Sequence, residues 1–168
     1  MKKHEEGNSI HKSIAQARIL VVEDDFDIRQ VLCLYLKYSG FDVLEALDGQ
    51  EAIRLIPEYH PDLLVLDLMM QPVDGWEVLH WLRARRMNPS LPVLVLTALY
   101  QPAEQLLGFE EGAIEYLTKP TQTSLIVERI RTILGLSTEQ RMMLQRRRMD
   151  EQRNTLDRIA AQPDEFLH

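Results

Sequence analysis

The stretch Leu63-Leu64-Val65-Leu66-Asp67-Leu68-Met69-Met70 decides the fold of this chain. It is a short apolar run with a single carboxylate, that of Asp67, near its end. Aspartate is a poor strand residue, and its ionised side chain is costly to bury without partners. Asp67 therefore lies at the mouth of a strand or beside cations, and its partners must come from other parts of the chain.

Four other short apolar runs resemble this one, and segments with helical spacing separate all five. The other expected strands are residues 18–22, 41–46, 92–97 and 115–118, and the expected helices lie at about 28–39, 50–59, 76–82, 101–111 and 124–134. Continuous apolar strands are typical of a parallel sheet that helices cover on both faces. The pattern therefore predicts an open α/β fold, in which the ligand site lies at the carboxyl ends of the strands.

Polar side chains follow four of the five runs. Glu23 and Asp24 follow the first run, Asp67 the third, Thr97 the fourth and Lys119 the fifth. Each has an ordinary interpretation on its own: a helix cap, a turn, a strand residue or a loop charge. Together they would converge at one edge of the sheet, where neighbouring carboxylates destabilise one another unless a cation neutralises them. Oxygen ligands without a His/Cys cluster favour Mg²⁺, which is commonly shared with a phosphoryl group.

This cluster suits phosphoryl transfer to an aspartate. A carboxylate can attack phosphorus to give an aspartyl phosphate, and the protein then supplies mainly positioning and charge neutralisation. Asp67 is the candidate nucleophile because it lies on the central run, and Asp24 would hold Mg²⁺ with Glu23 beside it. Lys119 would pair with one phosphoryl oxygen, and Thr97 would donate a hydrogen bond to another.

The same residues carry a resemblance to a known family. The spaced segments are Ile19-Leu-Val-Val-Glu23-Asp24-Asp25, Asp67 with Asp74-Gly75, Leu96-Thr97-Ala98 and Tyr116-Leu-Thr-Lys119-Pro120. Over about 18–134 the chain resembles the receiver domain of two-component response regulators, of the chemotaxis-receiver type. The resemblance implies a flavodoxin-like, doubly wound sheet of five parallel strands in the order 2-1-3-4-5, with five flanking helices.

The resemblance also implies a reaction and its residues. A phosphoryl group would pass from the phosphohistidine of a sensor histidine kinase, or of a phosphotransfer protein, to Asp67 in the presence of Mg²⁺. Glu23 and Asp24 would be the acidic pair that binds Mg²⁺, together with Asp67 and the backbone carbonyl of Met69. Such a receiver phosphorylates and dephosphorylates itself and is not a conventional turnover enzyme.

A conformational switch is implied as well. Thr97 and Tyr116 would form the switch pair: the hydroxyl of Thr97 moves toward the phosphoryl group, and the ring of Tyr116 turns inward. The face made by the fourth helix, the fifth strand and the fifth helix would then signal to a downstream protein partner.

The remaining segments are expected to be a flexible leader at 1–17 and a helical extension at 136–168, on either side of a receiver domain at 18–135. Ser137 opens the extension with a capping signal, and the helix could run to about Ala161. Because 33 residues are too few for a separate domain, we expect no DNA-binding domain in this chain.

The role of the extension stays open from sequence alone. Met142, Met149 and Leu156 are seven residues apart, but the apolar seam is thin, so any coiled coil or homodimer would be weak. The arginines at 146–148 are most simply a solvated helix face. A dimerising or docking helix comes next, and contact with nucleic acid is the least favoured interpretation.

The composition of the chain indicates which partners and which cellular compartment to expect. The net charge of −7 argues against non-specific binding of nucleic acid. With a single cysteine, Cys33, a disulfide framework is excluded and a reduced compartment is favoured. No stretch approaches the ~20 apolar residues of a membrane span, so a cytoplasmic protein with no membrane partner is expected.

Two alternatives to a working receiver follow from the same residues. An aspartate-nucleophile phosphohydrolase of the haloacid-dehalogenase type needs a second aspartate two residues after the nucleophile, where this chain has Met69. A degenerate receiver that only binds partners would be expected to lack the acidic pair or Lys119, and both are present.

Overall fold

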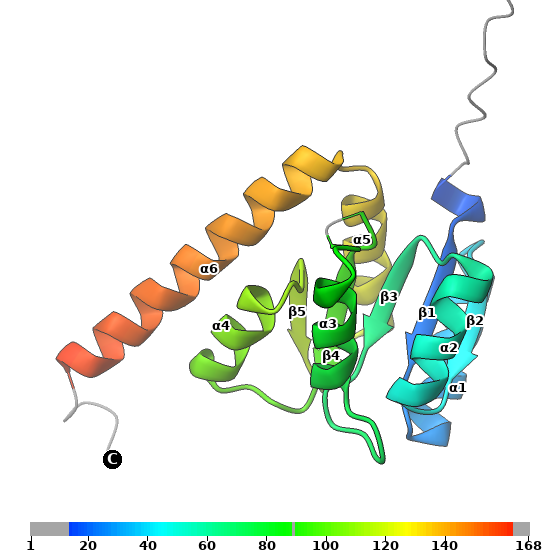
Figure 1. Ribbon diagram of the computed structural model, residues 1–168, viewed down its shortest axis with the longest axis horizontal. Helices are drawn as coiled ribbons and strands as arrows, with labels where there is room; N and C mark the ends of the chain where they lie inside the picture. The colour runs from blue at the N-terminus through cyan, green and yellow to red at the C-terminus, as the bar shows by residue number, and fades with distance from the viewer. Residues whose placement is uncertain (1–13, 89, 163–168) are drawn as a thin grey trace, which may run out of the picture.

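Five parallel strands form one sheet in the order β2-β1-β3-β4-β5, in a computed structural model that describes residues 14–88 and 90–162 (Figure 1). The strands are β1 (Arg18–Val22), β2 (Asp42–Ala46), β3 (Leu63–Leu66), β4 (Val93–Thr97) and β5 (Glu115–Thr118). The predicted strand order is confirmed, and the predicted strands lie within a few residues of the observed ones. The strand that ends at Asp67 is the central one.

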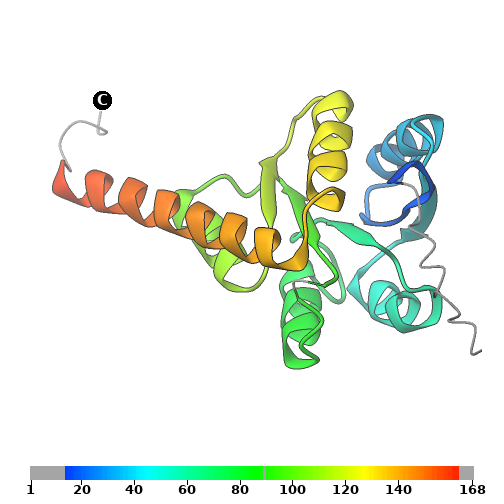
Figure 2. The ribbon, with the colours of Figure 1, turned by 90° about the horizontal axis from the view of Figure 1, so that it is seen from above.

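Helices follow every strand and cover both faces of the sheet (Figure 2). They are α1 (Phe26–Tyr38), α2 (Gly49–Tyr59), α3 (Gly75–Ala84), α4 (Pro102–Glu110), α5 (Thr123–Leu134) and the additional α6 (Thr138–Ala161). The helices α1 and α5 pack on one face, and α2, α3 and α4 pack on the other. No helix in the described part of the chain has the length and apolar character that a membrane span requires.

The strands alternate between two apolar cores because successive side chains point to opposite faces. In β1, Ile19 and Val21 belong to the core under α1 and α5, whereas Leu20 and Val22 belong to the core under the other three helices. Both faces are buried, so the strands read as continuous apolar runs rather than as alternating ones.

The carboxyl ends of the strands lead directly into capped helices. Asp25, Asp48 and Asp74 are the N-cap residues of α1, α2 and α3, and the side chain of each accepts a hydrogen bond from a backbone amide in the first helical turn. These caps satisfy amides that have no partner within the helix. Asp25 therefore starts α1 and is distinct in role from the acidic pair before it.

The start of the chain differs from the expected leader at its boundary. Ile14–Gln16 form a short 3-10 turn, and Ala17 is buried and accepts a hydrogen bond from the amide of Asp42. Ala17 therefore packs with the folded unit, whereas Ile14 and Gln16 are exposed. The rest of the predicted leader, 1–13, lies outside the described residues.

One glycine fixes the approach of α3 to the central strand. A Cβ atom on Gly75 would lie 2.2 Å from the carbonyl oxygen of Asp67 and 2.7 Å from the Cα atom of Leu68. Backbone atoms cannot move aside as a flexible side chain can. Only a residue without a side chain can therefore stand where α3 begins against the residue that follows β3.

We expect Gly75→Ala to lower the free energy of unfolding by about 1–3 kcal/mol, the usual cost of inserting atoms into a packed site. Urea denaturation would measure the loss. Gly135→Ala is the matched control because its Cβ atom would meet its nearest neighbours at 3.5 Å, an ordinary contact. That control should change stability by no more than about 0.5 kcal/mol. Equal losses in the two variants would contradict the close approach.

Candidate functional site

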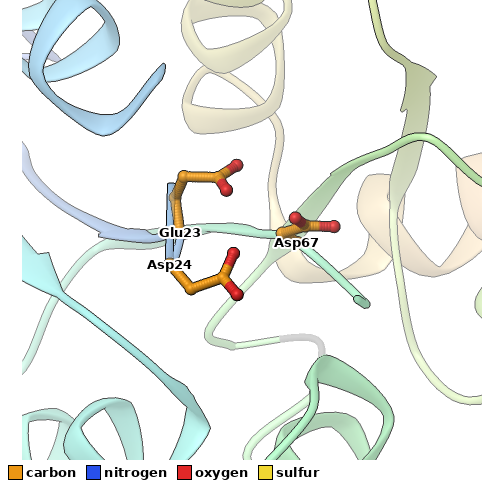
Figure 3. Close-up of side chains that lie close together, drawn as sticks. All are labelled: Glu23, Asp24 and Asp67. Carbon is orange, nitrogen blue, oxygen red and sulfur yellow. The ribbon is translucent and has the colours of Figure 1, made fainter. Parts of the chain in front are cut away.

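Three carboxylates meet at the carboxyl edge of the sheet (Figure 3). Glu23 and Asp24 follow β1 and Asp67 follows β3, and one carboxylate oxygen of each lies within 4.8 Å of the others. The amide of Asp67 donates to the carbonyl of Val22 at 3.0 Å, which extends the pairing of β1 and β3 by one residue. Strand register therefore brings Asp67 beside the acidic pair, as the sequence predicts.

Lys119 reaches the same cluster from the end of β5. Its Nζ donates to Oε2 of Glu23 and, at 3.0 Å, to Oδ2 of Asp67. Glu23 and Asp67 are buried, whereas Asp24 is exposed. Two buried carboxylates thus share one ammonium group, and the third carboxylate faces solvent beside them.

Burial and the hydrogen bond between Glu23 and Lys119 shift the pKa values of these two residues in opposite directions. Burial raises the pKa of Glu23, and the negative charge of Asp67 raises it further. The hydrogen bond from Lys119 lowers this pKa, but by less than burial raises it. Burial alone would lower the pKa of Lys119, but the hydrogen bond to Glu23 and the charge of Asp67 outweigh it, so that pKa is raised. Lys119 therefore stays charged at neutral pH.

The second oxygens of the two buried carboxylates accept bonds from nearby backbone amides. Oδ1 of Asp67 accepts from the amide of Met69 at 3.1 Å, and Oε1 of Glu23 accepts from the amide of Asp25 at 3.1 Å. Charged acceptors make shorter, stronger hydrogen bonds than neutral ones. Both side chains are thereby held in fixed orientations at the edge of the sheet.

Arg29 also supports the site, and sequence reasoning missed it. Its side chain is buried in α1 and donates to the carbonyl of Glu23 at 2.8 Å, with Glu45 3.6 Å away. The sequence did contain a sign of this role, because an arginine within the first apolar helical pattern would be buried and would need an acceptor nearby.

The donor set fits a divalent cation. Three carboxylates face one ammonium group, so Glu23, Asp24 and Asp67 keep an excess of negative charge and offer oxygen ligands only. Mg²⁺ takes such oxygens and keeps waters on its exposed side, where Asp24 lies. These three residues could therefore hold the ion; a contribution from the Met69 carbonyl stays a prediction.

Thr97 lies at the same edge of the sheet. It is buried at the end of β4, and its carbonyl accepts a hydrogen bond from the amide of Lys119 at 2.8 Å. Its hydroxyl oxygen is 3.5 Å from the amide of Leu99, a weak contact that leaves the hydroxyl group available to another partner.

Tyr116 lies further from the carboxylates, with its ring beneath α4. Its hydroxyl donates to the carbonyl of Leu99 at 2.9 Å, and its ring centroid is 6.1 Å from that of Phe109. The ring is 7% exposed. Leu99 therefore contacts both members of the predicted switch pair, Thr97 through its amide and Tyr116 through its carbonyl.

A family model described as the response regulator receiver domain matches residues 19–131. The chain belongs to this family. Among solved structures, the receiver domain of the Francisella response regulator 1452 is similar, with a TM-score of 0.68 and 33% identity over 71% of this chain and 97% of that one. The BeF₃-activated receiver domain of Klebsiella pneumoniae RstA has a TM-score of 0.65 and 30% identity, over 71% and 99% of the two chains.

Curated receiver-family proteins match over the same region. The DNA-binding dual master transcriptional regulator RpaA of Synechocystis is 40% identical over 117 residues, which are 70% of this chain and 48% of that protein. The response regulator MprA of Mycolicibacterium vanbaalenii is 42% identical over 121 residues, 72% and 52% of the two. The receiver thus spans about half the length of these relatives, and its flavodoxin-like fold and its place in two-component signalling are as predicted.

Removal of the shared ammonium group should destabilise the protein. We expect Lys119→Met to lower the free energy of unfolding at pH 7 by roughly 2–4 kcal/mol, because Glu23 and Asp67 would face each other without their cation. Protonation of Glu23, whose pKa burial raises, would relieve this repulsion, so the loss should shrink as the pH falls toward 5. Urea denaturation at both pH values measures this.

The control for this variant is Lys37→Met, which removes an exposed lysine from α1. It should change stability by about 0.5 kcal/mol or less at either pH. A loss in Lys119→Met that stayed the same between pH 7 and pH 5 would show that carboxylate repulsion is not its cause.

Proposed function

We propose that Asp67 accepts a phosphoryl group from the phosphohistidine of a sensor histidine kinase or phosphotransfer protein. The observation that carries this proposal is the position of the Asp67 carboxylate, held between Lys119 and the acidic pair at the mouth of the central strand. An oxygen of Asp67 forms the new bond to phosphorus while the bond from phosphorus to the histidine nitrogen breaks. The released imidazole is protonated from solvent.

The residues around Asp67 have separate roles in this transfer. Lys119 pairs with a phosphoryl oxygen, and the Thr97 hydroxyl donates to another. Glu23, Asp24, Asp67 and the Met69 carbonyl would hold Mg²⁺, which would supply positive charge to the phosphoryl oxygens.

The phosphoryl group stays on the protein's own side chain until water removes it, so we propose a regulator and not a turnover enzyme. Thr97 and Tyr116 form the switch pair that reports phosphorylation to the face made by α4, β5 and α5. A downstream protein is the proposed reader of this switch.

We place the protein in the cytoplasm, with no membrane partner, and we favour a protein over a nucleic acid as partner of the described residues.

Labelling tests the acceptor. With Mg²⁺ and radiolabelled acetyl phosphate, the wild-type chain should take up label that hydroxylamine releases, as expected of an acyl phosphate, and Asp67→Asn should fall to background. The control Asp42→Asn changes an exposed aspartate at the start of β2 and should label as the wild type does. Equal labelling of wild type and Asp67→Asn would refute the acceptor. An unlabelled wild type would favour a receiver fold that only binds partners.

Metal binding can be tested separately. Mg²⁺ at about ten times its Kd should stabilise the protein by about 1.4 kcal/mol through mass action, seen as a rise in Tm. Asp24→Asn should lose this response while it stays folded, because Asp24 is exposed. Asp42→Asn should keep the response, and EDTA should reverse it. A full response in Asp24→Asn would remove this residue from the metal site.

A further inference from the structure

The helix α6 lies along α4 and passes the start of β5, so it covers part of the face made by α4, β5 and α5 (Figures 1 and 2). One side of α6 makes the contacts, and we call it the docking stripe. The stripe residues recur at helical spacing: Arg141, Leu144, Gln145, Arg148, Met149 and Gln152. The face that the sequence predicted as a signalling surface therefore has an occupant from the same chain.

Polar side chains fix α6 along the length of α4. Nε2 of Gln145 donates to the carbonyl of Phe109 at 2.6 Å, near the C-terminal end of α4. One turn of α4 earlier, Nε2 of Gln152 donates to Oε1 of Gln105 at 3.2 Å. The two helices therefore run antiparallel and in a defined register.

A buried carboxylate joins α6 to the sheet. Glu115 at the start of β5 is 5% exposed, and its Oε2 lies 3.0 Å from Arg148 of α6 and 3.2 Å from Arg129 of α5. A buried carboxylate that loses a cationic partner is destabilised. This pairing gives the docked position of α6 a charge-dependent anchor beside Tyr116.

Tyr116 lies directly under this arrangement. Its ring fills the space beside Gly108, where a Cβ atom would be 2.9 Å from two ring carbons. Met149 of the docking stripe packs against the apolar core that contains Phe109 and Tyr116. Arg148 of α6 binds Glu115, the residue before Tyr116, so α6 passes over β5 beside the ring, where a ring turned outward would meet it.

A chain of contacts leads from the ring to the acceptor site. The Tyr116 hydroxyl is bonded to the carbonyl of Leu99, the Leu99 amide contacts the Thr97 hydroxyl, and the Thr97 carbonyl accepts from the amide of Lys119. Lys119 in turn binds Asp67. The position of α6 and the charge state of Asp67 thus act on opposite ends of one connected set of residues.

We propose that α6 is a built-in clamp that holds the Tyr116 ring inward and thereby favours the phosphorylated state of Asp67. This inference rests on the proposed function, in which the inward ring accompanies phosphorylation. Since coupling between two sites is reciprocal, phosphorylation must in turn tighten the docking of α6. A downstream protein that reads the phosphorylated state at this face therefore meets it with α6 in place.

The test weakens docking in the full chain. Gln145→Ala combined with Arg148→Ala removes two polar anchors and leaves Arg129 to pair with Glu115. The control pair, Arg147→Ala with Asn154→Ala, removes the same two kinds of group from exposed positions of α6. Hydrogen exchange of α6 and β5 reports docking, and labelling by acetyl phosphate reports the state of Asp67.

The undocked variant should exchange faster in α6 and β5 and hold at least about fivefold less phosphoryl group at steady state, the lower end of typical coupling. The control pair should match the wild type, and Arg148→Lys with Gln145 intact should recover much of the labelling. Faster exchange with unchanged or increased labelling would overturn the clamp. Labelling that still depends on Asp67 would leave the proposed function standing.

A reciprocal measurement avoids substitutions that affect folding. Beryllofluoride with Mg²⁺ mimics the phosphoryl group, and it should slow hydrogen exchange in α6 of the wild-type protein. Asp67→Asn should show no such protection. Unchanged or faster exchange in α6 of the wild type, with protection at the acceptor site itself, would also overturn the clamp.

Discussion

The rest of this structure depends on one interaction, the pairing of the Lys119 ammonium group with two carboxylates. The ammonium group binds Glu23 and Asp67, two buried carboxylates that would otherwise repel each other. The three residues come from the ends of β1, β3 and β5, so the interaction exists only when the sheet is assembled in this order. The proposed phosphoryl transfer and the stability of the fold therefore depend on the same few side chains.

This arrangement explains why the meeting of these side chains could be predicted from sequence. In a parallel sheet every strand ends at the same edge, so a residue just after an apolar run has a known location. Glu23, Asp67 and Lys119 each follow such a run, and strand order alone then brings them together. N-cap aspartates are also predictable from sequence, because each one accepts a hydrogen bond from a backbone amide only three residues further along the chain.

The docked helix could not be predicted in this way. Its capping signal at Ser137 and its end near Ala161 were visible, because caps are local features. Its contacts depend on Gln145 and Arg148, which are residue types that usually face solvent on a helix. They also depend on Glu115, and nothing in the sequence around Glu115 indicates a partner on a later helix. Arg146 and Arg147 do form the expected solvated face, but Arg148 does not.

The chemistry of the α6 contact also bears on what the helix can do. No residue of α6 within the described part of the chain is fully buried, and the docking stripe combines hydrogen bonds and ion pairs with a few partly buried apolar side chains. Such groups also find partners in water, so leaving the receiver costs α6 far less than the loss of a helix from the core would. A modest change in free energy can therefore tighten or loosen this contact, as the proposed coupling to Asp67 requires.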